Sequence, residues 1–84
     1  MKPVFTTAFV RKYDKVPQRI QLRFEKQLGL LLANLQHPSL RAKKVYSEQL
    51  KRWVCQARIN GGWRFYFDIE HDALYLLTIQ PHPK

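Results

Sequence analysis

Two arginines, Arg58 and Arg64, are the residues of this sequence best suited to hold an anionic group. A guanidinium is always protonated, and its planar fork matches the oxygens of a phosphate or a carboxylate. The pattern around them predicts that they lie opposite each other on the solvent face of a β-hairpin, where like charges destabilise the ladder. We therefore expect an anion between them, either a phosphate or a carboxylate of a partner. The alternative is that both arginines are merely solvated.

His82 is the candidate for proton transfer. If residues 70–72 form a three-residue loop, Arg64 lies opposite Thr78 and His82 emerges near the arginine pair; a two-residue loop would shift this register. A histidine can move protons at neutral pH, and flanking guanidiniums can stabilise charge that develops on a phosphate. This combination suits RNA cleavage without a metal ion, in which the 2′-oxygen attacks the adjacent phosphate. The alternative for His82 is a residue of a disordered tail.

Positive charge dominates the chain, which carries 15 Lys and Arg residues against 6 Asp and Glu residues, a net charge of +9. Such a field favours a polyanion or an acidic protein partner and does not distinguish them. The candidate substrate-binding side chains are Lys43, Lys44, Lys51, Arg52 and Tyr66. Tyr66 could stack on a base. The alternatives are a solvated basic face for the lysines and Arg52, and an ordinary exposed strand tyrosine for Tyr66.

The sequence predicts neither a metal site nor a cofactor. Asp68, Glu70, His71 and Asp72 resemble metal ligands, but they span a predicted turn and no Cys/His spacing supports a closed site. The single cysteine, Cys55, excludes a disulfide framework. No segment approaches the roughly 18 apolar residues of a membrane span. We expect a cytoplasmic protein that does not bind a membrane.

The arginine pairing follows from the periodicity of the segments that carry it. In residues 53–59 and 63–69, apolar side chains recur at every second position, which is typical of half-buried strands and puts Trp53 on the core face. A two-residue Gly-Gly turn would mix the core and solvent faces. A three-residue loop with a bulge, which pairs Ile59 with Trp63, is therefore the better interpretation.

The remaining elements complete a single domain of residues 1–84. In chain order we predict a short edge strand at residues 4–5, a helix from Thr6 or Thr7 to about Lys15, an amphipathic helix from Pro17 to about Gln36, a basic turn or extended segment at 37–45, a loop at 46–51 and three antiparallel strands. The fold class is α+β, with an N-terminal helical hairpin packed on one face of a mostly antiparallel four-stranded sheet. The last strand, residues 73–79, is apolar on both faces, so we expect it inside the sheet, with Leu74 and Leu76 on the uncovered face if the preceding loop has three residues.

With these elements in place, the chain resembles the RelE/ParE-superfamily toxins of type II toxin–antitoxin modules over nearly its whole length. The resemblance rests on the segments His-Pro-Ser-Leu-Arg-Ala-Lys-Lys at 37–44, Ala-Arg-Ile at 57–59, Gly-Trp-Arg-Phe-Tyr-Phe at 62–67 and Pro-His-Pro-Lys at 81–84. The arginine-bearing hairpin is the specific part of this pattern. The helices are generic.

The resemblance implies a microbial cytoplasmic protein with a RelE-like fold, β-α-α-β-β-β, that is neutralised by a cognate acidic antitoxin. In the RelE-like branch, which we favour, it implies cleavage of mRNA on the ribosome without a metal ion. Arg64 matches the family's catalytic arginine, Arg58 an arginine on the preceding strand, and His82 a position that carries arginine or histidine. Gln56 and Val54 stand where RelE itself has lysines. The alternatives are a ParE-like inhibitor of DNA gyrase and a non-catalytic member that binds RNA or antitoxin.

Overall fold

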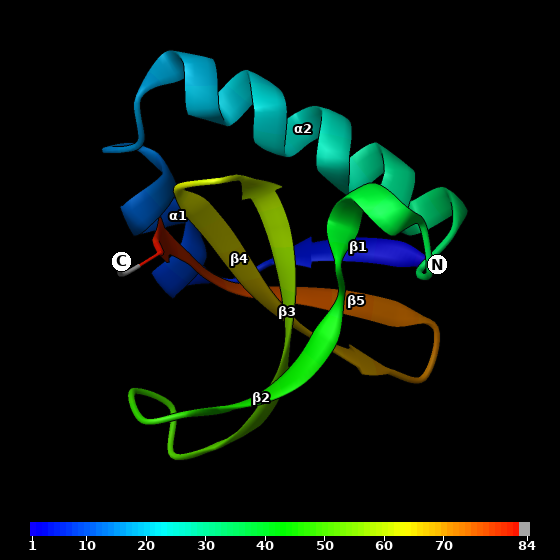
Figure 1. Cartoon of the computed structure of the whole chain (residues 1–84). Coiled ribbons are helices and arrows are strands. Elements are labelled where there is room, and N and C mark those ends of the chain that lie inside the picture. The colour runs from blue at the N-terminus through cyan, green and yellow to red at the C-terminus, as the bar shows by residue number, and fades with distance from the viewer. Residues whose placement is uncertain (83–84) are drawn as a thin grey trace.

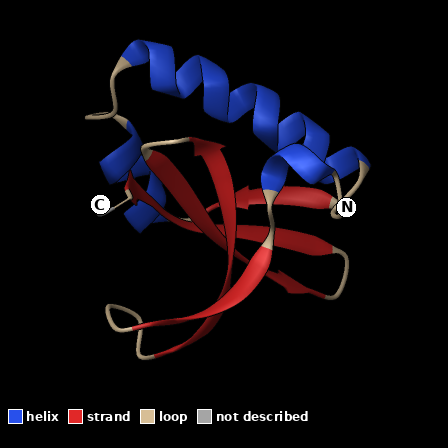
Figure 2. Ribbon diagram, viewed as in Figure 1, coloured by secondary structure: helices blue, strands red, loops and turns tan. Residues whose placement is uncertain are grey.

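Two α-helices lie across one face of a five-stranded sheet (Figure 1, Figure 2). The computed structural model describes residues 1–82. The elements are β1 (Lys2–Phe5), α1 (Thr7–Tyr13), α2 (Gln18–Ala33), the 3-10 helix η1 (Pro38–Leu40), β2 (Lys43–Ser47), β3 (Arg52–Asn60), β4 (Trp63–Glu70) and β5 (Ala73–Pro81). The strand order is β1-β5-β4-β3-β2, with β1 parallel to β5 and the other neighbours antiparallel. No helix in this described part is long and apolar enough to span a membrane.

The α+β class is confirmed, but the predicted four-stranded sheet after an N-terminal helical hairpin is wrong in detail. The sheet has five strands rather than four and is mixed, because β1 is parallel to β5, whereas the predicted strand before the helices is confirmed. The missed strand is β2, which pairs with β3 in the register Val45 to Val54. It lies at an edge of the sheet and most of its side chains are polar, so it lacks the apolar alternation that reveals a half-buried strand.

The core lies between the helices and the facing side of the sheet, and aromatic rings connect its layers. Phe9 of α1 lies 5.3 Å from Phe24 of α2 between ring centroids, and Phe24 meets Phe65 of β4 edge-on at 5.0 Å. The predicted cap of the first helix is confirmed, because the Thr6 hydroxyl accepts a hydrogen bond from the Phe9 N–H. The same hydroxyl donates to the carbonyl of Leu76, which ties the start of α1 to β5.

The β3–β4 hairpin confirms the pairing of Arg58 with Arg64 but not the predicted loop. Asn60 pairs with Trp63, so the turn contains only two glycines, and Ile59 is the extra residue of a bulge between the two pairs. The predicted pairing of Ile59 with Trp63 is therefore wrong. The bulge within the strand, rather than a longer loop, lets Ile59 remain buried while Arg58 stays on the outer face, the face of the sheet away from the helices.

The β4–β5 hairpin has a two-residue turn, so the predicted three-residue loop and the pairing of Arg64 with Thr78 are wrong. Arg64 lies opposite Gln80, and a register shift between Tyr66 and Phe67 changes the phase of β5. Leu74 and Leu76 are fully buried in the core beneath the helices, not on the uncovered face as predicted. The interior position of β5, between β1 and β4, is confirmed.

Trp53 is exposed rather than buried in the core, where its periodicity predicts it. Its exposed fraction is 65%, whereas Val54 beside it is buried. Figure 1 shows that the end of β2 and the start of β3 curve away from the helices, so the helices do not cover this end of the strand pair. Trp53 instead meets Tyr46 of β2 edge-on, with ring centroids 5.7 Å apart.

Candidate anion-binding site

The outer face holds a cationic cavity of about 170 Å³ beside the turn between β3 and β4, which we call the arginine cavity. The residues that line it are Arg41, Lys43, Gln56, Arg58, Arg64 and His82. The cavity is thus built by residues from several parts of the chain: the segment after η1, three strands, and the last residue that the structure describes. Four of these six side chains are lysine or arginine, so the cavity is suited to an anion. The three residues predicted to act together, Arg58, Arg64 and His82, do lie together.

Arg64 folds back over the hairpin turn. Its Nη1 donates hydrogen bonds to the carbonyl of Asn60 at 2.6 Å and to that of Trp63 at 3.0 Å. Desolvation lowers the pKa of Arg64, and the positive charges of Arg58 and Arg41 lower it further, against an opposing effect of Tyr66. A lowered pKa means that the protonated form is disfavoured, so burial and the neighbouring positive charges both oppose the charge on the Arg64 guanidinium. An anion in the cavity would relieve it.

The backbone beneath Arg58 is held by the side chain of Gln27 in α2. Gln27 is 2% exposed, and its Nε2 donates to the carbonyl of Arg58 at 2.8 Å and to that of Ser39 at 3.4 Å. Arg23, one helical turn earlier, donates from Nε to the carbonyl of Ile59 at 3.4 Å. Helix α2 therefore fixes the bulge that presents Arg58 and, through Ser39, the segment that presents Arg41.

His82 reaches the cavity because the last described residues continue along the hairpin. Its backbone N–H donates to the carbonyl of Gly62 at 2.8 Å, and the strand partner of Pro81 is Trp63. These contacts hold His82 beside the turn while its side chain stays exposed at the cavity. Pro83 and Lys84, which completed the predicted C-terminal motif, lie outside the described residues.

The fold of this chain is similar to the folds of several solved structures. The YoeB/ParE toxin from Agrobacterium tumefaciens superposes with a TM-score of 0.76 at 13% identity, over 99% of this chain and 100% of that one. YafQ from Escherichia coli gives a TM-score of 0.77 at 13% identity, over 96% and 92%. A chain of the RelBE2 toxin–antitoxin complex from Mycobacterium tuberculosis gives 0.73 at 22% identity, over 96% of both chains.

The chain has the same fold as these solved toxins. No protein-family model matches the sequence, and no curated protein matches it significantly. The likeness is therefore one of backbone architecture, and it extends over nearly the whole of each compared chain.

Within this fold, the predicted substrate-binding residues lie in several different places, and of them only Lys43 lines the arginine cavity. Lys43 lines the arginine cavity, and Tyr66 lies two residues beyond Arg64 on β4. Lys44 instead lines a hollow with Cys55 and Phe67, where burial raises the pKa of the Cys55 thiol.

Lys51 and Arg52 lie at the opposite end of the β2–β3 ribbon. Lys51 occupies the turn with a φ of 59°, and Arg52 forms an ion pair with Asp68. They do not contribute to the arginine cavity, and nor does Lys44.

Arg41 and Arg23 are site residues that the sequence did not identify. Arg41 lines the arginine cavity, and both line a neighbouring cleft of about 370 Å³ that also contains Arg58. Arg41 follows η1 in the left-handed conformation, with a φ of 46°. Its charge is visible in the sequence, but a single left-handed residue in a loop leaves no periodic signal. The two cavities share Arg41 and Arg58.

Proposed function

We propose that this chain is the toxin of a type II toxin–antitoxin module and that it cleaves mRNA on the ribosome. The observation that carries the proposal is the convergence of Arg58, Arg64 and His82, with Arg41 and Lys43, on one cavity. Guanidiniums recognise phosphate oxygens in a bidentate way, and a histidine beside them can transfer a proton. The similar architecture of known toxins supports the proposal.

In the proposed reaction, Arg58 and Arg64 bind the non-bridging oxygens of the scissile phosphate. A base takes the proton of the adjacent 2′-hydroxyl, and the 2′-oxygen attacks phosphorus as the bond to the 5′-oxygen breaks. His82 donates a proton to that leaving oxygen, which yields a 2′,3′-cyclic phosphate and a 5′-hydroxyl. The paired guanidiniums stabilise the negative charge that develops on the phosphate, so the chemistry needs no metal ion.

We further propose a cognate acidic antitoxin in the cytoplasm as the protein partner. The net charge of +9 and the cationic cavity favour an acidic protein on the outer face. One of the similar structures is a toxin–antitoxin complex. A carboxylate of such a partner, placed between Arg58 and Arg64, would occupy the position of the scissile phosphate and block cleavage.

The experiment is a comparison of two targets with one preparation of protein. A cell-free bacterial translation reaction receives the purified chain, and the mRNA is mapped by primer extension; a parallel reaction measures supercoiling by DNA gyrase. We expect new mRNA ends only when ribosomes are present, with gyrase unaffected. Inhibited supercoiling with intact mRNA would replace the nuclease proposal with gyrase inhibition, and activity in neither reaction would leave a non-catalytic binding protein.

A further inference from the structure

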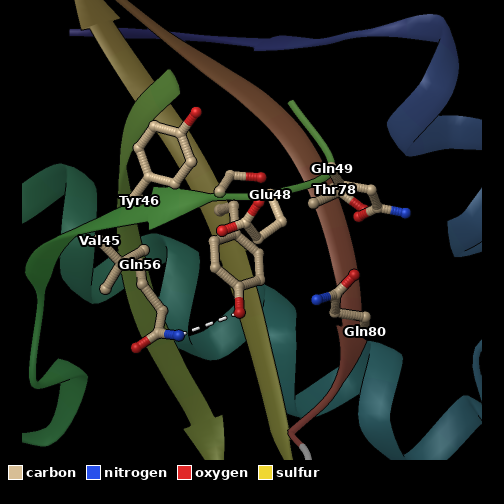
Figure 3. Close-up of a pocket in the computed structure, with 9 residues that line it drawn as sticks. Val45, Tyr46, Glu48, Gln49, Gln56, Thr78 and Gln80 are labelled. Atoms are coloured by element: carbon tan, nitrogen blue, oxygen red, sulfur yellow. Dashed lines mark hydrogen bonds between the residues drawn. The ribbon is translucent and has the colours of Figure 1, made fainter. Parts of the chain in front are cut away.

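Another cavity, of about 350 Å³, lies on the outer face beside the arginine cavity, and we call it the aromatic cavity (Figure 3). Its walls come from β2, the turn after β2, β3, β4 and β5. Figure 3 shows Gln56 and Gln80 on either side, with Glu48 from the β2–β3 turn in front of the strands. The volume is in the range of small-molecule sites.

The lining of this cavity is aromatic and polar, and its chemistry suits a flat ring with hydrogen-bonding edges. Tyr66 lies within it, and its hydroxyl accepts a hydrogen bond from Nε2 of Gln56 at 3.0 Å. Thr78 is 8% exposed, and its buried hydroxyl has no hydrogen-bond partner among residues 1–82. A buried polar group without a partner is costly, so a ligand that supplies one is favoured.

The two cavities are adjacent subsites of one surface. Gln56 lines both. Arg64 pairs with Gln80 and Tyr66 with Thr78, which are successive outward-facing pairs of the β4–β5 ladder. Residues two apart on a strand lie about 7 Å apart on the same face. A phosphate held by Arg64 therefore has a polar cavity that contains an aromatic ring next to it, and a nucleotide presents a phosphate and a base side by side.

We propose that this cavity binds a nucleobase with an exocyclic amino group, next to the phosphate that the arginines hold. The base stacks on Tyr66, and its polar edge meets Gln56 and the carboxylate of Glu48. Where the carboxylate of Glu48 faces position 4 of the ring, it accepts a hydrogen bond from the amino group of cytosine and repels the carbonyl oxygen of uracil, so cytosine is favoured over uracil. The inference rests on the proposed RNA substrate and adds base preference to it.

The test uses three uncleavable probes: CMP, UMP and ribose 5-phosphate, which has no base. Amide chemical shifts of the isotope-labelled protein report where each probe binds. We expect ribose 5-phosphate to perturb only the surroundings of Arg58 and Arg64, and CMP to perturb residues 45–49, 66 and 78–80 as well. UMP should bind at least about threefold more weakly than CMP, and Glu48→Gln should remove most of that difference. Equal binding of CMP and UMP would overturn the role of Glu48.

Variants of two tyrosines separate base stacking from general effects. Tyr66→Leu should weaken CMP binding at least fivefold and leave ribose 5-phosphate binding unchanged, because base stacking on an aromatic ring is lost. Tyr66→Phe should retain the affinity for CMP. Tyr75→Leu is the matched control, because Tyr75 lies on β5 outside the cavity. Identical perturbation by CMP and ribose 5-phosphate would overturn the proposal.

The outcome is independent of nuclease activity. If CMP occupies the cavity but the chain leaves ribosome-bound mRNA intact, the base subsite stands and the nuclease function fails. If mRNA is cleaved and CMP perturbs only the arginine cavity, the subsite fails and the nuclease function stands.

Discussion

Arg58 and Arg64 lie opposite each other on neighbouring strands, so their positive charges repel each other. Their cross-strand pairing follows from the apolar alternation on either side of the turn, and the structure retains it although the loop differs from the prediction. The part played by Arg41 could not be predicted, because it depends on one left-handed residue after η1. Periodicity fixes which face a strand residue occupies, whereas the position of a loop residue depends on individual dihedral angles.

The repulsion between the two arginines predicts a stabilising substitution. Arg58→Gln should raise the free energy of unfolding by on the order of 0.5 kcal/mol, because it removes one of two like charges that face each other across the ladder. Urea denaturation at low salt measures the change, and about 0.5 M salt should reduce it by screening. Arg19→Gln, on the exposed side of α2, is the control and should have little effect. If Arg58→Gln destabilised the protein, the proposed repulsion between Arg58 and Arg64 would be contradicted.

Substitutions of His82 distinguish proton transfer from phosphate binding. If His82 protonates the leaving oxygen, His82→Gln should lower single-turnover cleavage far more than ribosome binding. His82→Arg should then be slow as well. If His82 only contacts phosphate, His82→Arg should preserve the rate. Unchanged rates in both variants would remove His82 from the mechanism.

At the scale of elements, the position of one bulge and the presence of a second separate the structure from its sequence-based prediction. The predicted bulge of the first hairpin lies at Ile59 and shortens the turn, and the second, between Tyr66 and Phe67, changes which residues of β5 face the core. The starts of the helices and most of the strands follow from local patterns, whereas both helices end two or three residues before their predicted ends and the edge strand β2 was not predicted. Bulges are set by packing against other elements, such as the hydrogen bond of Gln27 to Arg58, and a local pattern does not contain that information.

Gln27 should be a positioning residue for the site. Gln27→Leu leaves the buried carbonyl of Arg58 without its donor, which should cost about 1–3 kcal/mol of unfolding free energy. Cleavage should also fall under conditions where the variant is still folded, because the bulge that presents Arg58 loses its anchor. Gln18→Leu at the exposed start of α2 is the matched control. A folded Gln27→Leu protein with full stability and activity would refute this role.

Tyr13 links α1 to α2 and predicts a loss of stability at alkaline pH. Its hydroxyl donates to the carbonyl of Gln21 at 3.1 Å and to Glu25 at 3.0 Å. Burial, followed by the effects of Glu25, raises the pKa of Tyr13 from 10.0 to about 12. A raised pKa favours the protonated form in the folded state, so this stabilisation is complete below pH 10 and is lost as the pH rises towards 12.

Unfolding measured between pH 9 and 12 should therefore show a smaller alkaline decline for Tyr13→Phe than for the wild type. Tyr75→Phe, at a tyrosine of β5, provides the comparison and should decline as the wild type does. An identical decline in Tyr13→Phe and the wild type would show that this hydroxyl does not contribute.

At the scale of the whole molecule, the helices cover one face of the sheet and leave the other free for a ligand. The core and the helices account for the fold, whereas the arginine cavity and the aromatic cavity both open on the outer face. The positive net charge follows from the composition, whereas the gathering of positive charges around the arginine cavity depends on the fold. A basic surface of this kind should bind a polyanion with an affinity that falls steeply with salt.

The central claim is that the paired arginines cleave ribosome-bound mRNA, and single-turnover cleavage on programmed ribosomes tests it most directly. Relative to the wild type, Arg64→Ala should lower the cleavage rate at least about 100-fold while the fold and ribosome binding persist, because one donor to the developing phosphate charge is removed. Arg19→Ala, which removes an equal charge from an exposed residue that does not line the cavity, should cleave at the wild-type rate. Full activity of Arg64→Ala, or equal losses in both variants, would contradict the account.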